Sequence, residues 1–197
     1  MQFEQYVRFM NTIEKLKCNT RHSWNSNGRR ESVAEHSWRL AVMAMLCHDE
    51  YPHVDIDKVI KMCLIHDFGE AITGDIPSFF KTDDDEKKEE NAISSLLKML
   101  PEEQGREFGL LFEEMAEMKS EEAKLYKALD NLEALISHNE ADISTWIPRE
   151  YTENLIYGQE NCEFSSWTKG LKAFIKSQAI EKMEKAKKEE ASDTQNK

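Results

Sequence analysis

The segment CLIHDFGEAITGDIP, residues 63–77, decides the fold, because it places polar groups where helical periodicity calls for apolar ones. Its first residues continue an apolar helical face that includes Val59 and Cys63, and His66 falls on that same face. Asp67 comes next, and Glu70 lies one helical turn beyond His66. Burying a bare carboxylate costs several kcal/mol unless a partner compensates it. The segment therefore predicts a polar site inside a helical core.

The rest of the chain has the composition of a helical protein. Of its 197 residues 40% are hydrophobic, 32% are charged, and only seven glycines and four prolines interrupt the chain. We expect one all-α domain, a helical bundle over residues 1–180, followed by a charged, disordered tail at 181–197. Residues 141–163 should be irregular, and no hairpin signal is present. Helical periodicity predicts helices near 3–18, 32–50, 55–71, 84–99, 101–118, 120–141 and 164–188.

Charge and cysteine usage exclude several classes of function. The formal net charge of −12 argues against a nucleic acid polymer as partner, because such binding depends on basic side chains that neutralise phosphates. No apolar run approaches the ~20 residues that span a bilayer, so we expect no membrane partner. The four cysteines form no C-x-x-C pair, which favours a reduced, cytoplasmic protein. A small anionic ligand can still bind, because one cation and an arginine can reverse the local electrostatic field of an acidic protein.

Two further polar residues fall on apolar helical faces. His36 lies in line with Leu40, and Asp130 lies beside the ridge that contains Leu129. If the helices bring His36, His66, Asp67 and Asp130 together, the two imidazoles and two carboxylates form a site for one divalent transition metal, such as Mn, Co, Fe, Ni or Zn. Each residue also has a simpler interpretation. A histidine can be hydrogen-bonded within the core, and Asp130 can be a cap or half of a salt bridge.

The remaining histidines do not fit such a site. His48-Asp49 repeats the His-Asp dipeptide of residues 66–67. It lies at the end of a predicted helix, where we expect it to face solvent. His22, His53 and His138 lie in polar surroundings and are predicted at the surface. No histidine lies between Asp67 and Asp130, so the predicted site holds a single metal ion.

These residues carry a resemblance to a known family. The order H…HD…D is similar to that of the HD superfamily of metal-dependent phosphohydrolases. Three stretches, ESVAEHSWRLAVMA (31–44), IHDFGEAITGDIPSF (65–79) and KALDNLEAL (127–135), resemble its small single-domain branch, which includes bacterial 5′-deoxynucleotidases. The resemblance covers roughly residues 3–175. It implies an HD-domain helical bundle with the metal site in its core.

The resemblance also implies roles for individual residues. The metal ligands would be His36, His66, Asp67 and Asp130, and Glu70 would correspond to the catalytic glutamate. The nucleotide's sugar and base would meet a loop formed by Asp75, Ile76, Pro77 and Ser78. An Arg-Trp element that orients the phosphate would correspond to Arg21 and Trp24, although two residues separate them here, so Arg29 and Arg30 are alternatives for the phosphate. Members of this branch are homodimers, which is the assembly that the resemblance implies.

The expected activity follows from these roles. The chain should be an enzyme that releases phosphate from deoxynucleoside 5′-monophosphates by attack of a metal-bound water. Asp67 would ligate the metal and orient the water, while Glu70 would either deprotonate that water or protonate the leaving sugar oxygen. A raised pKa, expected for a glutamate near apolar walls and another carboxylate, favours the acid role. Asp75 would contact a sugar hydroxyl, and Arg21 would neutralise phosphoryl charge. The alternatives are hydrolysis of nucleoside triphosphates or cyclic nucleotides, and a non-catalytic helical module with a structural metal.

Overall fold

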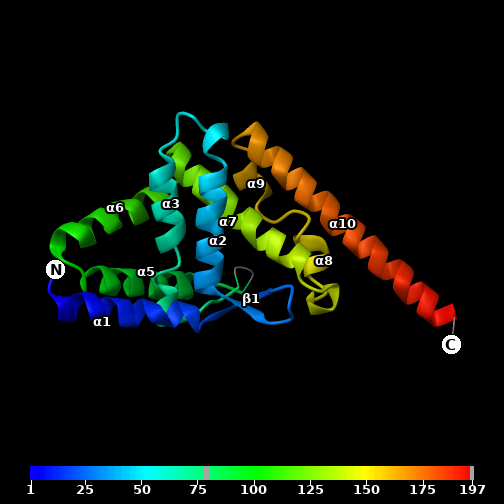
Figure 1. The fold of residues 1–197 in the computed structure, drawn as a ribbon, viewed down its shortest axis with the longest axis horizontal. Coiled ribbons are helices and arrows are strands. Elements are labelled where there is room, and N and C mark those ends of the chain that lie inside the picture. Colours follow the sequence, from blue (N-terminus) through cyan, green and yellow to red (C-terminus); the bar gives the residue numbers. More distant parts are fainter. Residues whose placement is uncertain (78–79, 196–197) are drawn as a thin grey trace. The chain divides into compact units, whose positions relative to one another are not determined.

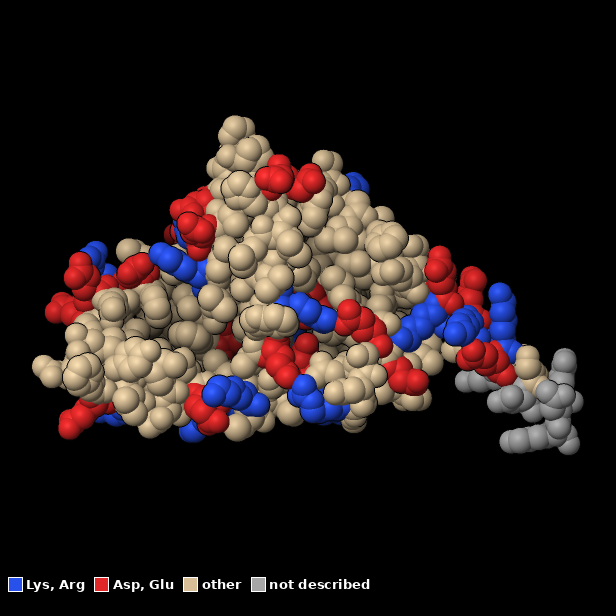
Figure 2. Space-filling model, viewed as in Figure 1, with Lys and Arg blue, Asp and Glu red and all other residues tan. Residues whose placement is uncertain are grey.

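The computed structural model describes residues 1–77 and 80–195, and helices dominate it (Figure 1), which confirms the predicted all-α class. Among these residues no helix combines the length and the apolar character that a membrane span requires. Acidic and basic side chains are interspersed on the face shown in Figure 2. Contacts divide the chain into two compact units, residues 1–22 with 30–127 and residues 23–29 with 128 onward.

The first unit is built mainly from helices. The packing of α2 against α3 buries Leu40 and Ala44 of the former and Val59 and Met62 of the latter. Its elements are α1 (Phe3–Ile13), η1 (Glu14–Lys17), β1 (Thr20–Trp24, as far as residue 22), β2 (Arg30–Ser32), α2 (Val33–Leu46), η2 (His48–Glu50), α3 (Ile56–Ile65), α4 (Glu70–Thr73), α5 (Asp83–Leu97), α6 (Glu102–Glu117) and the start of α7 (Glu121–Glu140).

One aromatic residue ties the turn that contains His66 and Asp67 to the core of this unit. Phe68, directly after Asp67, packs against two clusters of buried residues, one around Leu96 and one around Val33. Its ring lies 6.0 Å from that of Phe9. Edge-to-face contacts of this kind add to the energy of area burial. Phe68 therefore anchors to the core the short turn that carries His66 and Asp67.

The structure corrects several sequence-based predictions in this unit. The expected single helix over 55–71 ends at Ile65, and a turn over 66–69 separates α3 from α4. The helix expected over 32–50 ends at Leu46. The expectation that the chain forms no hairpin was also wrong, because β1 and β2 pair as a two-stranded sheet. Gly28 has a φ of 81°, a left-handed conformation that glycine adopts without steric cost, and this allows the chain to turn between the strands.

The second unit contains the later part of α7, three short helical turns and a long final helix. The segment 141–163, predicted irregular, includes η3 (Ile143–Thr145), α8 (Glu150–Glu153) and α9 (Gln159–Cys162). Trp146 ties this segment to α7 by donating from its indole nitrogen to the carbonyl oxygen of His138 at 2.9 Å. His138 itself is half-buried, 3.4 Å from the carboxylate of Glu150, so its predicted surface position was wrong.

The final helix, α10 (Ser166–Gln195), continues past the end near residue 188 that periodicity predicts. It packs on α9, and the side-chain amide of Asn139 donates to the carbonyl oxygen of Ile175 at 2.9 Å. The expected tail, residues 181–197, is helical as far as Gln195, and residues 196–197 lie outside the described part of the chain. A boundary between domain and tail at residue 180 stays a prediction.

Candidate metal centre

His36 is placed by the start of α2. Ser32 caps this helix by accepting from the backbone N–H of Glu35, and the Glu35 carboxylate accepts from the N–H of Ser32 at 2.8 Å. This reciprocal capping box satisfies two backbone donors and determines where the helix begins. His36 follows within the first turns, on the face that packs into the core, and has no exposed surface. The predicted inward orientation of His36 is confirmed.

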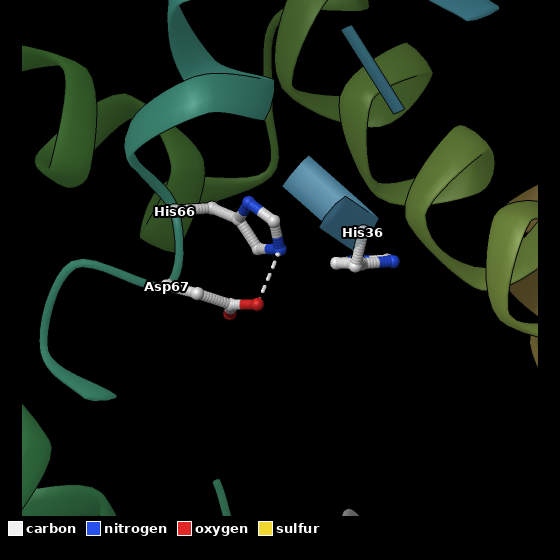
Figure 3. Close-up of side chains that lie close together, drawn as sticks. All are labelled: His36, His66 and Asp67. Atoms are coloured by element: carbon white, nitrogen blue, oxygen red, sulfur yellow. Dashed lines mark ion pairs between the residues drawn. The ribbon is translucent and has the colours of Figure 1, made fainter. Parts of the chain in front are cut away.

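His66 and Asp67 are placed by the end of α3. His66 is the C-cap of the helix and is 9% exposed, while the side chain of Asp67 in the following turn is 13% exposed. The two imidazole rings of His36 and His66 lie 5.3 Å apart at an angle of 64°. Each of the three residues offers one ligand atom, and these atoms lie within 4.8 Å of one another. Figure 3 shows the three side chains gathered from α2 and from the turn after α3.

The hydrogen bonding of His66 determines what the cluster can hold. The Nδ1–H of His66 donates to the carbonyl oxygen of Cys63 at 2.9 Å, so the neutral ring carries its lone pair on Nε2. That Nε2 lies 3.0 Å from Oδ2 of Asp67, which is also an acceptor. Two facing acceptors require a cation or a second proton between them. A divalent transition metal meets this requirement, and the donor to the Cys63 carbonyl is the usual outer contact of a metal-binding histidine.

Arg21, on β1, reaches this cluster. Its guanidinium lies 3.5 Å from Oδ2 of Asp67 and 3.4 Å from Oε2 of Glu31. Burial would raise the pKa of Asp67, but the charges of His66, Arg21 and His36 outweigh it and hold that pKa below its ordinary value. The guanidinium of Arg30 instead donates to the carbonyl oxygen of His22 at 2.6 Å.

The environments of Glu70 and Asp75 differ from that of Asp67. Glu70 opens α4 and is 7% exposed, and its Oε2 is buried with no hydrogen-bond partner among the described residues. Burial, followed by the negative charges of Asp67 and Asp75, raises the pKa of Glu70 to about 10, against the opposing charge of Arg21. Burial also raises the pKa of Asp75. Glu70 is therefore protonated at neutral pH when no cation is bound, as expected for a general acid.

A cavity of about 490 Å³ borders Glu70 on the side of α5. Gly74 and Ile76 line it from the segment after α4, and Lys81, Glu89 and Asn91 line it from α5 and the residues before it. Pockets of this size accommodate small-molecule ligands.

The structure brings together most of the predicted site residues of the first unit. His36, His66, Asp67 and Arg21 form the cluster, and Glu70 and Asp75 interact electrostatically with Asp67. Asp130 and Trp24 belong to the second unit, where Asp130 is 8% exposed and Trp24 is half-buried. Arg29 is exposed and also belongs to the second unit, and Ser78 lies outside the described residues. The metal-binding roles stay predictions.

The sequence analysis missed two acidic residues that shape the site. Glu31 is 2% exposed and pairs with Arg21 from the neighbouring strand, which could have been found only by recognising the hairpin. Glu89 lies on α5 among many charged residues, so that periodicity marks it only as a solvated position. Its contact with the turn at Gly69 is a property of the tertiary structure.

Two kinds of sequence comparison find related proteins. A family model described as "HD domain" matches residues 13–171, a single match that includes parts of both units. The mouse protein named "5′-deoxynucleotidase HDDC2" is 36% identical over 138 residues, which cover 68% of this chain and 68% of that protein. The fission yeast protein "5′-deoxynucleotidase hdd1" is 28% identical over 173 residues, 79% of this chain and 86% of that protein.

A solved structure agrees with these matches. A crystal structure from Magnetospirillum magnetotacticum, described as a "Predicted metal-dependent phosphohydrolase", superimposes with a TM-score of 0.78 and 31% identity. The superposition covers 93% of both chains. The likeness therefore extends to the fold of nearly the whole chain.

Proposed function

This chain belongs to the HD-domain family and is a phosphohydrolase of that family, and we propose that it releases inorganic phosphate from deoxynucleoside 5′-monophosphates. The observation that carries the proposal is the cluster of His36, His66 and Asp67 with the buried Glu70 beside it. Relatives named 5′-deoxynucleotidases support the choice of substrate.

We propose one divalent transition metal, Mn, Co, Fe, Ni or Zn, held by His36, His66, Asp67 and Asp130. The facing acceptors support His66 and Asp67 as ligands, and the ligand atom of His36 within 4.8 Å of theirs supports the third. Support for Asp130 comes from the register of α7. The ring of Tyr126 lies 5.5 Å from that of His66, and Asp130 follows Tyr126 by four residues on the same helix, hence on the same face.

The protein's own groups have distinct tasks in this proposal. A bound metal ion would act as a Lewis acid and lower the pKa of water toward neutrality. Arg21, held at the cluster by Glu31, would face the phosphoryl oxygens and stabilise their developing charge. Glu70 would donate a proton to the 5′-oxygen as the bond to phosphorus breaks, because burial raises the pKa of its carboxyl group and so favours the protonated form. Uncatalysed hydrolysis of phosphate monoesters is extremely slow, so all of these contributions are required.

The sugar would be bound by the segment after α4. Gly74 has a φ of 76°, which turns the chain so that Asp75, Ile76 and Pro77 follow α4 directly. The half-buried carboxyl group of Asp75 would hydrogen-bond a sugar hydroxyl and favour deoxyribose. Ser78 and Trp24 complete the proposed sugar contacts.

We also propose that the protein is a cytoplasmic homodimer. The family resemblance supports the dimer, and exposed apolar side chains such as Trp38, which is 64% exposed, offer surface for it. The four free cysteines support a reducing compartment. Light scattering after size exclusion would test the assembly, and a monomer at micromolar concentration would refute it.

The activity can be tested with a small panel of substrates. Purified protein loaded with each metal in turn should release phosphate from dAMP faster than from AMP, with Glu70→Gln as the inactive control. Pyrophosphate from dATP, or AMP from cyclic AMP, in the absence of phosphate from dAMP would refute the proposal. Full turnover by Glu70→Gln would refute the catalytic role of Glu70, and no turnover by any metal-loaded sample would favour a structural metal.

A further inference from the structure

The cavity beside Glu70 is lined by none of the three cluster residues His36, His66 and Asp67. The backbone N–H of Glu70 donates to the carbonyl oxygen of Asp67 at 3.0 Å, which ties the residue to the cluster. Glu70 lines the cavity, and its buried Oε2 has no hydrogen-bond partner among the described residues. A nucleoside monophosphate has its phosphate at one end and its base at the other, and the bond to be broken lies between them. A general acid at that bond therefore has the phosphate on one side and the nucleoside on the other.

One wall of the cavity presents an ion pair. The ammonium of Lys81 pairs with the carboxylate of Glu89, and their side chains are 29% and 16% exposed. Burial would lower the pKa of Lys81, but the hydrogen bond and charge of Glu89, with the charges of Glu70 and Asp67, raise it. The lysine therefore stays charged, and the pair offers a hydrogen-bond donor and an acceptor side by side.

Close packing holds this wall in place. A Cβ atom on Gly69 would lie 2.7 Å from Cγ of Glu89 and 3.2 Å from its carbonyl oxygen. The turn between Asp67 and Glu70 thus touches α5 at Glu89 without room for a side chain. Because Glu89 is fixed against this turn and Lys81 against Glu89, the ion pair keeps a defined position relative to Glu70.

We propose that this cavity receives the nucleoside part of the substrate and that the Lys81–Glu89 pair hydrogen-bonds the base. Every nucleobase carries acceptor atoms that an ammonium can contact, while adenine, cytosine and guanine, but not thymine, carry an exocyclic amino group for a carboxylate. A paired donor and acceptor thus accepts all four bases, with Glu89 favouring those that have an amino group. The inference rests on the proposed nucleotidase activity and adds the residues that recognise the base.

The test compares a substrate that has a base with one that lacks it. The Lys81→Met variant should lose about 10- to 100-fold in kcat/KM for dAMP, as expected for a lost charged hydrogen bond, and keep its kcat/KM for 2-deoxyribose 5-phosphate. Lys61→Met is the matched control, because Lys61 also pairs with a glutamate, Glu107, but is 56% exposed and is not among the residues that line the cavity. It should leave both substrates unchanged.

A second variant separates base recognition from folding. Glu89→Gln should reduce kcat/KM for dAMP more than for dTMP, since only adenine has the amino group. Lys81→Arg, which keeps the charge, should restore part of the activity on dAMP if Lys81→Met folds poorly.

The outcomes are distinguishable. Equal losses on both substrates, or no loss on either, would overturn the role of Lys81 in base binding. If the wild-type protein hydrolyses neither substrate, the proposed function fails instead.

Discussion

Gly69 offers a direct test of the packing that holds the turn over residues 66–69 against α5. The backbone of Gly69 has φ −54° and ψ −35°, which alanine adopts without strain. The Gly69→Ala change would therefore stabilise the protein by ~0.4–1 kcal/mol through the unfolded chain if space were free. Space is not free, because the added Cβ would lie 2.7 Å from Cγ of Glu89 and 3.2 Å from Cγ1 of Ile93.

The expected magnitude follows from these opposing terms. Overpacking by one methyl group costs ~1–3 kcal/mol, so the net destabilisation should be about 1–2 kcal/mol. For a chain of this length that lowers the melting temperature by about 2–8 °C. Gly170→Ala is the control. Gly170 is exposed on α10, nothing lies within 4 Å of its added Cβ, and the same backbone term should raise the melting temperature by about 1–4 °C.

Differential scanning calorimetry of both variants, with and without added metal, gives the answer. Opposite signs for the two glycines are expected. A Gly69→Ala protein as stable as Gly170→Ala would refute the close approach of Glu89 to the turn, and with it the fixed position of the Lys81–Glu89 pair.

Three further predictions concern the site and the second unit. Glu70→Gln should lower kcat by about 10²- to 10⁴-fold, because the amide cannot donate the proton, while circular dichroism stays that of the wild type; turnover within twofold of wild type would contradict this. Asp130→Asn should reduce the metal content of the purified protein measured by mass spectrometry, whereas Asp49→Asn, at a fully exposed aspartate of the second His-Asp pair, should not; equal metal content in both would remove Asp130 from the ligand set. Burial lowers the pKa of Lys172 to about 8, so between that pH and about 10.5 the unfolded chain binds more protons than the folded one, and stability rises with pH. Urea unfolding of Lys172→Met should therefore lack a rise between pH 8 and 10 that the wild type shows, and identical pH profiles would contradict the burial of a charged amine.

Local rules were sufficient for the helices and for the burial of the key histidines. The capping box at Ser32 and Glu35 begins α2 where the sequence predicts it, and the phase of that helix then decides that His36 points inward. His48 and Asp49 are exposed as expected, because no apolar ridge continues through them. These features depend on residues within one or two turns of each other, which is the range over which periodicity and capping operate.

The hairpin and the acidic partner of Arg21 could not be predicted, because they depend on contacts beyond one or two turns of the chain. Arg21 meets Glu31 only because two short strands pair, and short strands carry a weak period-two signal. The helix that periodicity predicts through Asp67 ends at Ile65, because Phe68 turns into the core between α1 and α6. There it contacts Phe9 and Phe108, which are distant from it in the sequence.

The amino-acid sequence by itself determined the all-α class, the inward histidines and the family, because each depends on local pattern or on matching residues in order. Only the tertiary structure decided that the pKa of Glu70 is raised and that Lys81 lines the same cavity. Those properties arise from burial and from charges that approach through space, and residues far apart in the chain supply both.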